Sequence, residues 1–455
     1  MKNIAVALPY AVSIRDFVNG GTFEALSSGG EFRLTIYTLN PDIPELEAVR
    51  AKGFQILPFT PYENTRLEAF CKRVYPQFFS DQMAYLQLTN ADNVLRRLFG
   101  NGMSLLRRMM GPRLTLKLVG SVLAALNSRR HLPDQLTEPA DLFIGTRSLV
   151  NSVDYGLVAE ANRRGIPMLT LASSWDNFTT KGYFPFPTKG TVVWNEQMRE
   201  ELLALFDVEP DKIVVAGYPR ARLLQERVRD TDPETYLSSI GIDGYKRFVL
   251  YSASYGELTR APGHPIPLEY EGILSICAAL EPTLPEDVCI LIRLHPFSNE
   301  KDRALFATLP RCHVFVPGRA DKYVERVMGI ADEEHLATQL ARAEAIVSLA
   351  STVSIDALCL RKAIINVDFD VVEDVPLKWS SRRFYQFNHF RDLLRTARLP
   401  LAKSIEEVVQ FVHECLAGRH VRGVDMPAFE RMYVPPNSAD YPQHVRQAVK
   451  AMTND

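Results

Sequence analysis

The sequence predicts an α/β protein with two Rossmann-like domains and a cleft between them. Short apolar runs alternate with helical patterns in both halves of the chain, as expected for βαβ units and parallel sheets. The length of 455 residues is too great for one ordinary core and fits two domains of roughly 200 residues each. Two doubly wound sheets collect loops at the carboxyl ends of their strands, where ligands bind.

The first half contains seven apolar runs of strand length and one helical insertion. A buried first strand explains the apolar start better than a signal peptide does, because Asp16 and Asn19 follow without a cleavage site. Asn195 is expected to cap a helix over residues 195–206. The strands are predicted at 4–8, 34–37, 54–58, 142–145, 168–171, 191–194 and 213–216, and the insertion at about 62–132, inside a domain that spans 1–228.

A second series of strands follows a polar stretch at residues 225–246. That stretch has charges, a proline and two glycines but little apolar periodicity, so we expect the domain boundary there. The second domain is predicted over residues 243–430. Its strands are expected at 248–251, 288–294, 313–316, 345–349 and 363–367, and its helices at 270–280, 333–341, 353–360 and 405–416.

Charge and composition exclude several classes. The 52 Lys and Arg nearly balance the 54 Asp and Glu, which argues against a general nucleic-acid binder. The six cysteines form no CxxC pair, which favours free buried thiols in a reducing cytoplasm. The nine histidines show no spacing typical of a structural zinc site. No apolar run reaches the length of a membrane span, so we expect a cytoplasmic protein.

A basic loop follows the apolar run VCILI. Arg293 and His295, with Pro296 after them, stand where a parallel strand ends and α/β proteins bind ligands. An arginine offers a planar fork for phosphate oxygens, and a histidine adds a donor beside it. An ordinary strand end with a solvated arginine is the alternative.

Two hydroxyl-rich loops also follow predicted strands. Ser351 and Thr352 lie where a strand passes into a helix, and free backbone N–H groups there favour an anion. Ser351 could equally cap that helix. The further candidates in these two loops are Asp356, Ser252, Ser254 and Tyr255.

The order of these loops resembles the nucleotide-binding domain of GT-B glycosyltransferases that carry an HP motif and a later Ser-Ser/Thr motif. Polysialyltransferases, capsule Kdo transferases and CDP-glycerol glycerophosphotransferases share that pattern. The resemblance implies that His295 contacts the donor phosphate, and that Ser351 and Thr352 contact phosphate or ribose. It also implies a nucleotide donor on the second domain and an acceptor on the first. Residues 431–455, with a helix over 440–452, would then pack back on the first domain.

Three strings in the first half resemble bacterial surface-polysaccharide glycosyltransferases: SWDN…TKG, VWN…M and GxP. Asp176 in the first string follows a predicted strand, and its carboxylate could take the proton from an acceptor hydroxyl. An Asx turn is the structural alternative. Asp16 is the competing candidate for this base.

Asp368 and Asp370 form a DxD string, which metal-dependent transferases of another fold use. GT-B enzymes generally need no bound metal, and two acids after a strand are common. The resemblance therefore implies activity without a metal ion.

Residues 94–133 contain no Asp or Glu and carry eight basic side chains among apolar ones. Basic and apolar residues on helices are typical of a peripheral protein on an anionic membrane. Arg107 and Arg108, beside Met109 and Met110, are expected to act together there. A solvated basic face over an ordinary core is the alternative. The other basic residues are Arg96, Arg97, Arg113, Lys117, Arg129 and Arg130.

The resemblance implies a glycosyltransferase that moves a sugar from a nucleotide-activated donor to a cell-surface glycan or a lipid-linked acceptor. It implies no cofactor besides the donor, and a position in the cytoplasm or on the inner face of the plasma membrane. Three alternatives stay open: a CDP-polyol phosphotransferase, a sugar-nucleotide 2-epimerase that shares the fold and needs no acceptor, and a nucleotide-sugar-binding protein without catalysis.

Overall fold

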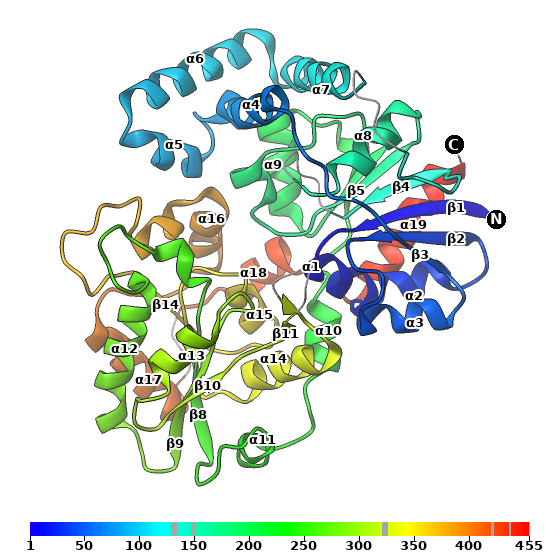
Figure 1. Ribbon diagram of the computed structural model, residues 1–455. Helices are drawn as coiled ribbons and strands as arrows, with labels where there is room; N and C mark the ends of the chain where they lie inside the picture. Colours follow the sequence, from blue (N-terminus) through cyan, green and yellow to red (C-terminus); the bar gives the residue numbers. More distant parts are fainter. Residues whose placement is uncertain (129–133, 147–151, 321–325, 420–422, 436–437, 455) are drawn as a thin grey trace. The chain divides into compact units, whose positions relative to one another are not determined.

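A computed structural model describes residues 1–128, 134–146, 152–320, 326–419, 423–435 and 438–454. The chain divides into two compact units (Figure 1). Unit 1 comprises Met1–Arg222 and Arg431–Asp455, and unit 2 comprises Leu223–Glu430. Helices α10 (Ala221–Glu226) and α18 (Met426–Tyr433) carry the chain from one unit to the other.

Unit 1 is built on a parallel sheet of seven strands in the order β3-β2-β1-β4-β5-β6-β7. The order reverses between β1 and β4, and such a switch point leaves a crevice at the carboxyl ends of the strands. All seven predicted strands are present, each within about two residues of the prediction. They are β1 (Lys2–Leu8), β2 (Phe32–Thr38), β3 (Gln55–Pro58), β4 (Leu142–Gly145), β5 (Met168–Leu171), β6 (Gly190–Val193) and β7 (Ile213–Val215).

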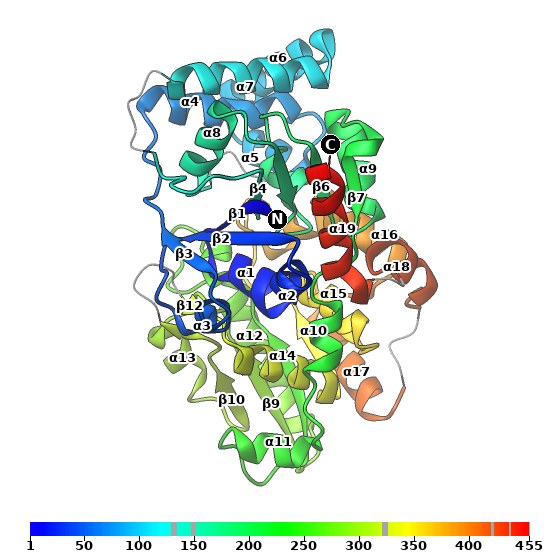
Figure 2. The same ribbon diagram turned by 90° about the vertical axis from the view of Figure 1, so that its right-hand side faces the viewer.

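Helices connect these strands, and the last helix of the chain, α19, also belongs to unit 1. Asn195 accepts a hydrogen bond from the backbone N–H of Met198 at 3.0 Å, so it caps α9 as predicted. Helix α19 packs against α2, β4 and β6 (Figure 2), and its Arg446 binds Glu31 at 2.8 Å. The helices are α1 (Ala11–Ile14), α2 (Thr22–Ser27), α3 (Glu47–Ala51), α8 (Tyr155–Arg163), α9 (Glu196–Phe206) and α19 (Tyr441–Asn454).

The predicted helical insertion stands between β3 and β4. Helix α6 packs against α5 and the short 3-10 helix Tyr75–Phe79, and α7 packs against α4, α8 and α9. Gly111 separates α6 from α7, which begins at Pro112, and the two helices meet at 110°. The helices are α4 (Arg66–Val74), α5 (Ala84–Ala91), α6 (Val94–Met110) and α7 (Pro112–Ser128).

Unit 2 is built on a parallel sheet of six strands in the order β10-β9-β8-β13-β14-β15, with a switch point between β8 and β13. The strands are β8 (Arg247–Ser252), β9 (Val288–Arg293), β10 (Cys312–Phe315), β13 (Ala345–Ser348), β14 (Ile364–Val367) and β15 (Leu401–Ala402); β11 (Arg319–Ala320) and β12 (Arg326–Val327) form a separate antiparallel pair. The helices are α11 (Pro233–Ser239), α12 (Leu268–Leu280), α13 (Glu300–Phe306), α14 (Ile330–Arg342), α15 (Val353–Cys359), α16 (Asn388–Ala397) and α17 (Ile405–Leu416).

Successive side chains of a strand point to opposite faces of the sheet, so these strands contribute to two cores, one on each face. On one face, Val249 and Ile290 belong to a buried cluster with Ile276 of α12 and Val412 of α17. On the other, the ring of Phe248 lies 6.2 Å from that of Tyr236 of α11. Burial on both faces explains why β8 and β9 read as continuous apolar runs.

Candidate functional site

Three loops of unit 2 leave the sheet side by side. In the register of the strands, Ser252 at the end of β8 pairs with Arg293 of β9 on one side and with Ser348 of β13 on the other. Neighbouring strands lie about 4.8 Å apart, so the loops after β9 and β13 start about 10 Å from each other. The basic loop and both hydroxyl loops therefore begin at one edge, at the switch point of the sheet.

His295 follows β9 in a defined tautomer. The backbone N–H of Phe297 donates to its Nδ1 at 3.1 Å. Burial, and then the nearby Arg293 guanidinium, lowers the pKa of His295 to about 4. The ring is therefore neutral at physiological pH and carries its proton on Nε2. A neutral donor can approach a phosphate oxygen without a charged ring being desolvated first.

Two aromatic rings hold the imidazole in place. The ring centroid of Tyr255, from the loop after β8, lies 5.6 Å from that of His295. Phe297 stands edge-on to the imidazole, with centroids 5.0 Å apart. Packing of this kind limits rotation of the ring and contributes to the low pKa by excluding water. The predicted candidates Tyr255 and His295, which follow the adjacent strands β8 and β9, are thus in contact.

Arg293 does not offer an open fork to a ligand, contrary to the prediction. Its side chain is buried, and Nη1 donates to Oε1 of Gln339 at 2.9 Å. The guanidinium carbon lies 5.2 Å from the ring centre of Phe315. The alternative of a solvated arginine is also wrong. Arg293 acts on the site through its charge, which lowers the pKa of His295.

Ser254 is engaged inside unit 2 by a residue that sequence analysis missed. Its backbone N–H donates to a carboxyl oxygen of Glu269 at 2.8 Å, and its hydroxyl hydrogen-bonds the other oxygen. Glu269 is fully enclosed in the first turn of α12, and burial raises its pKa to about 7. Ser254 is therefore a positioning residue that fixes the loop carrying Tyr255, rather than a group open to a ligand. The contact joins residues 15 positions apart in the chain, so no local sequence pattern could have indicated it.

The loop after β13 combines internal bonds with an open hydroxyl. The hydroxyl of Ser348 donates to the carbonyl of Ser252 at 2.9 Å and ties β13 to β8. Ser351 accepts from the backbone N–H of Val353 at 3.1 Å, which is a local cap that leaves its own O–H to donate. The side chain of Thr352 makes no hydrogen bond to another residue that the structure describes. Asp356 is buried in α15.

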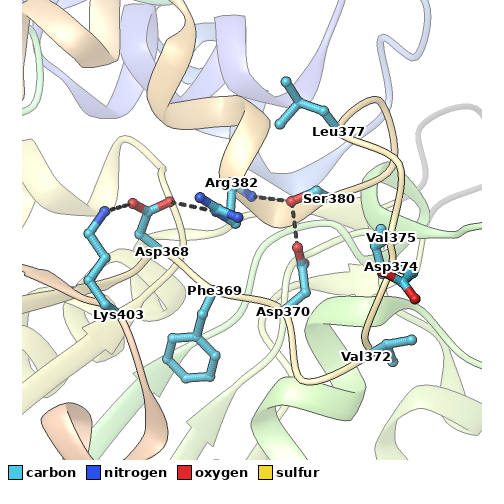
Figure 3. Close-up of a pocket in the computed structure, with 10 residues that line it drawn as sticks. All are labelled: Asp368, Phe369, Asp370, Val372, Asp374, Val375, Leu377, Ser380, Arg382 and Lys403. Atoms are coloured by element: carbon cyan, nitrogen blue, oxygen red, sulfur yellow. Dashed lines mark hydrogen bonds and ion pairs between the residues drawn. The ribbon is translucent and has the colours of Figure 1, made fainter.

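A pocket of about 490 Å³ lies beside this edge, at the end of β14 (Figure 3). The carboxylate of Asp368 pairs with Lys403 and lies 4.0 Å from Arg382. Asp370 accepts from the hydroxyl of Ser380 and from the backbone N–H of residue 381, the latter at 2.9 Å. Both acids of the DxD string are thus held by protein donors. Within the described ranges, no group of three His, Cys, Asp or Glu side chains could hold a metal ion.

In unit 1, Asp176 follows β5 in the predicted loop. Its carboxylate accepts from the hydroxyl of Thr180 at 3.0 Å and pairs with Lys181 at 3.1 Å. The side chain is 23% exposed. Side chains within five residues supply these partners, and Asp176 makes no side-chain hydrogen bond that caps the following turn, so the alternative of an Asx turn is not confirmed. The carboxylate still reaches solvent.

Asp16 lies at the switch point of unit 1. Its carboxylate pairs with Arg15 at 2.7 Å and lines a small cavity of about 20 Å³ with Thr146 and Ser173, which follow β4 and β5. The cavity has room for about one water molecule. The two candidate bases therefore follow different strands of one sheet.

No family model and no curated protein matches the sequence. Similar solved structures include a putative UDP-N-acetylglucosamine 2-epimerase from Listeria monocytogenes, with a TM-score of 0.56 at 13% identity over 99% of this chain and 96% of that one. The UDP-GlcNAc 2-epimerase of Neisseria meningitidis, bound to UDP-GlcNAc, has a TM-score of 0.53 at 12% identity over 100% of both chains. The UDP-GlcNAc 2-epimerase of Methanocaldococcus jannaschii, in complex with UDP-GlcNAc and UDP, has a TM-score of 0.53 at 10% identity over 100% of both chains.

The chain has a GT-B fold. The two parallel sheets and this likeness over nearly the whole length confirm the predicted fold class of two Rossmann-like domains. In this GT-B chain, the loops that carry the predicted groups of unit 2 begin at one sheet edge. Sequence analysis missed the partners that arrange them, which are Glu269, Gln339, Phe297, Arg382 and Lys403.

Proposed function

We propose that this protein is a glycosyltransferase that binds the phosphates of a nucleotide sugar at the carboxyl edge of β8, β9 and β13. The observation that carries this proposal is the neutral His295, whose Nε2–H is set by the hydrogen bond on Nδ1. The open hydroxyl of Thr352 and the O–H of Ser351 follow β13, two strands away. Neutral donors that converge at a switch point can stabilise charge on a leaving phosphate.

The polar pocket at the end of β14 fits the sugar of such a donor. It borders the proposed phosphate site, because β14 is the strand next to β13. Carboxylates and cations line it together, and this mixed lining suits a ligand with many hydroxyl groups better than an apolar one. We assign Asp370 and Arg382 as candidate sugar contacts.

Transfer also needs an acceptor hydroxyl and a group to take its proton. We assign that role to Asp176, with Asp16 as the competitor. The Asp176 side chain is more exposed, 23% against 15%, and Lys181 and Thr180 orient its carboxylate. The carboxylate of Asp16 faces a cavity too small for a sugar.

A sugar-nucleotide 2-epimerase is the second candidate, because solved proteins of this fold are UDP-GlcNAc 2-epimerases. The two candidates differ in the need for an acceptor. An epimerase converts the donor alone, whereas a transferase releases the nucleotide only when an acceptor is supplied.

Calorimetric titration with UDP, CDP and GDP tests the shared proposal first. Wild-type protein should bind one of them, and His295→Asn and Thr352→Ala should bind it more weakly. NMR of UDP-GlcNAc and other sugars of that nucleotide, with and without a bacterial lipid extract as acceptor source, then separates the candidates. Nucleotide release that depends on the extract supports transfer. Conversion at C2 without extract overturns transfer in favour of epimerisation.

A further inference from the structure

Helix α6 is buried through its polar side. Its enclosed residues are Gly100, Ser104 and Arg107, which recur at helical spacing on one face. The hydroxyl of Ser104 lies 2.9 Å from that of Ser80, and Nε of Arg107 donates to the Phe78 carbonyl at 2.9 Å. A Cβ at position 100 would come within 2.9 Å of the Ser80 hydroxyl oxygen, so glycine permits this close approach. Hydrogen bonds therefore attach the polar side of α6 to the segment around Phe78 and Ser80 within the same insertion.

The opposite side of α6 is apolar and exposed. Leu95, Leu98, Leu105 and Met109 follow at spacings of three, seven and four residues and form one stripe. Leu95 and Met109 are each 78% exposed. A helix on the surface of a globular protein normally turns its apolar stripe toward the core. Helix α6 has the reverse arrangement, which indicates that something apolar covers its outer side.

Helix α7 extends this surface with Leu114, Leu118 and Val122, spaced four residues apart. Nineteen large hydrophobic side chains are exposed in the described part of the chain, and ten of them lie on these two helices of 17 residues each. We call the exposed faces of α6 and α7 the α6–α7 surface. Clusters of this kind mark interaction sites, whereas single exposed apolar residues are ordinary.

The basic residues divide into two groups. Arg107 is buried and makes two hydrogen bonds to Asp81, and Arg108 pairs with the same carboxylate at 2.7 Å. The expectation that Arg107 and Arg108 act together at a membrane does not hold for Arg107, whose side chain is buried. Arg108 is 64% exposed, and the one carboxylate that the two arginines share leaves the pair with a net positive charge. Arg113 likewise pairs with Asp207 at 2.9 Å.

Three other cations are open. Arg96, Arg97 and Lys117 are exposed, and their side chains have no ion pair with another residue that the structure describes. They lie on the same two helices as the apolar stripe. Arg129 and Arg130, also expected in this group, fall outside the described residues.

We propose that the α6–α7 surface lies on an anionic lipid bilayer. A bilayer offers hydrocarbon for the apolar stripe and phosphate for Arg96, Arg97 and Lys117. A second copy of the chain is a poor match, because a two-fold contact would place these like charges against each other with no acid between residues 94 and 128 to offset them. The proposal does not depend on the transfer reaction.

The surface rests on the bilayer and does not cross it. No single helix among the residues described is long and apolar enough to span a membrane. Helices α6 and α7 reach that length and apolar character only together, as a pair bent by 110°. The buried polar seam of Ser104 and Arg107 also keeps one side of α6 against protein. Only the outer side is available to lipid, as in helices that lie in the membrane interface.

Flotation with vesicles tests the proposal, using phosphatidylglycerol mixed with phosphatidylcholine and phosphatidylcholine alone. The wild-type chain should float with the anionic vesicles at low salt and should be released as salt rises, because exposed charges are screened. Arg96→Glu with Arg97→Glu should weaken binding at least tenfold, since each basic side chain near an anionic surface strengthens binding about fivefold. Leu95→Ser with Met109→Ser should weaken it in both salt conditions.

Arg391→Glu with Arg395→Glu is the matched control, because both side chains are exposed on helix α16 of unit 2. This variant should bind vesicles like the wild type, and circular dichroism should show all variants folded. No wild-type binding at low salt overturns the proposal, as does equal loss in the control. A dimer in ultracentrifugation that Leu95→Ser with Met109→Ser abolishes, without vesicle binding, assigns the surface to a second copy instead.

Discussion

The two ring nitrogens of His295 have separate tasks, and two substitutions separate them. Nδ1 accepts the Phe297 N–H and Nε2 carries the donor proton. An asparagine places its amide near the position of Nδ1, and a glutamine places its amide near that of Nε2. His295→Asn should therefore keep the loop bond and lose the donor, whereas His295→Gln should keep a donor for the ligand.

The expected loss follows from the charge of the ligand. A hydrogen bond to a charged group contributes about 1.5–3 kcal/mol. Loss of one donor to a phosphate oxygen should lower kcat/KM by about 10- to 150-fold. A donor that acts mainly on the departing phosphate lowers kcat by a similar factor, and one that binds donor and transition state equally raises KM instead.

Initial rates and nucleotide titration on wild type, His295→Asn and His295→Gln provide the assay, and thermal unfolding controls for stability. The Asn variant should be folded and slow, and the Gln variant should retain clearly more activity. If His295→Asn is as active as wild type at unchanged nucleotide affinity, the assignment of Nε2 as a phosphate donor is refuted.

Four other predictions follow from the same contacts. His295 has a pKa of about 4, so kcat/KM should show no inflection from its protonation between pH 5 and 8, and a pH–rate profile in which His295→Gln removes an inflection near 6.5 would contradict this. The pKa of Glu269 is raised from 4.5 to about 7, so the folded state holds its proton more tightly and loses stability as pH rises through that window; the free energy of urea unfolding of Glu269→Gln should therefore increase relative to that of the wild type with rising pH, and a constant difference would count against it. Arg107→Ala removes the buried hydrogen bonds to the Phe78 carbonyl and to Asp81, although Arg108 still pairs with Asp81, so it should cost about 1.5–3 kcal/mol of stability in chemical denaturation, whereas Arg97→Ala should leave stability within about 0.5 kcal/mol. Activity should survive EDTA, because protein donors already hold the carboxylates of Asp368 and Asp370; loss that Mg²⁺ or Mn²⁺ restores would show that these acids bind metal.

Fold prediction succeeded where the signal is local. The run VCILI is buried on both faces of a parallel sheet, so it shows as a continuous apolar segment in the sequence. Strand β15 and the β11–β12 pair have two residues per strand, too few for any pattern. Helix α11 lies inside the expected boundary, and the sequence contains its start signal, because Asp232 accepts from the N–H of Thr235 at 2.8 Å.

The sequence places the candidate site residues at strand ends, but it does not show which way their side chains point. The end of a strand can be read from a sequence, so His295, Ser351 and Thr352 were expected at one sheet edge and begin there. Arg293 ends strand β9, and its buried partner Gln339 lies 46 residues later on helix α14. The pairing of Arg107 with Asp81 is equally non-local, across 26 residues.

The most direct measurement of the central claim is hydrogen–deuterium exchange of the full chain with and without UDP or CDP. A ligand bound at the proposed phosphate site should slow exchange in three peptides, at residues 253–256, 294–298 and 349–353, and His295→Asn should reduce that protection. Protection confined to other segments, or none at saturating nucleotide, would contradict the account.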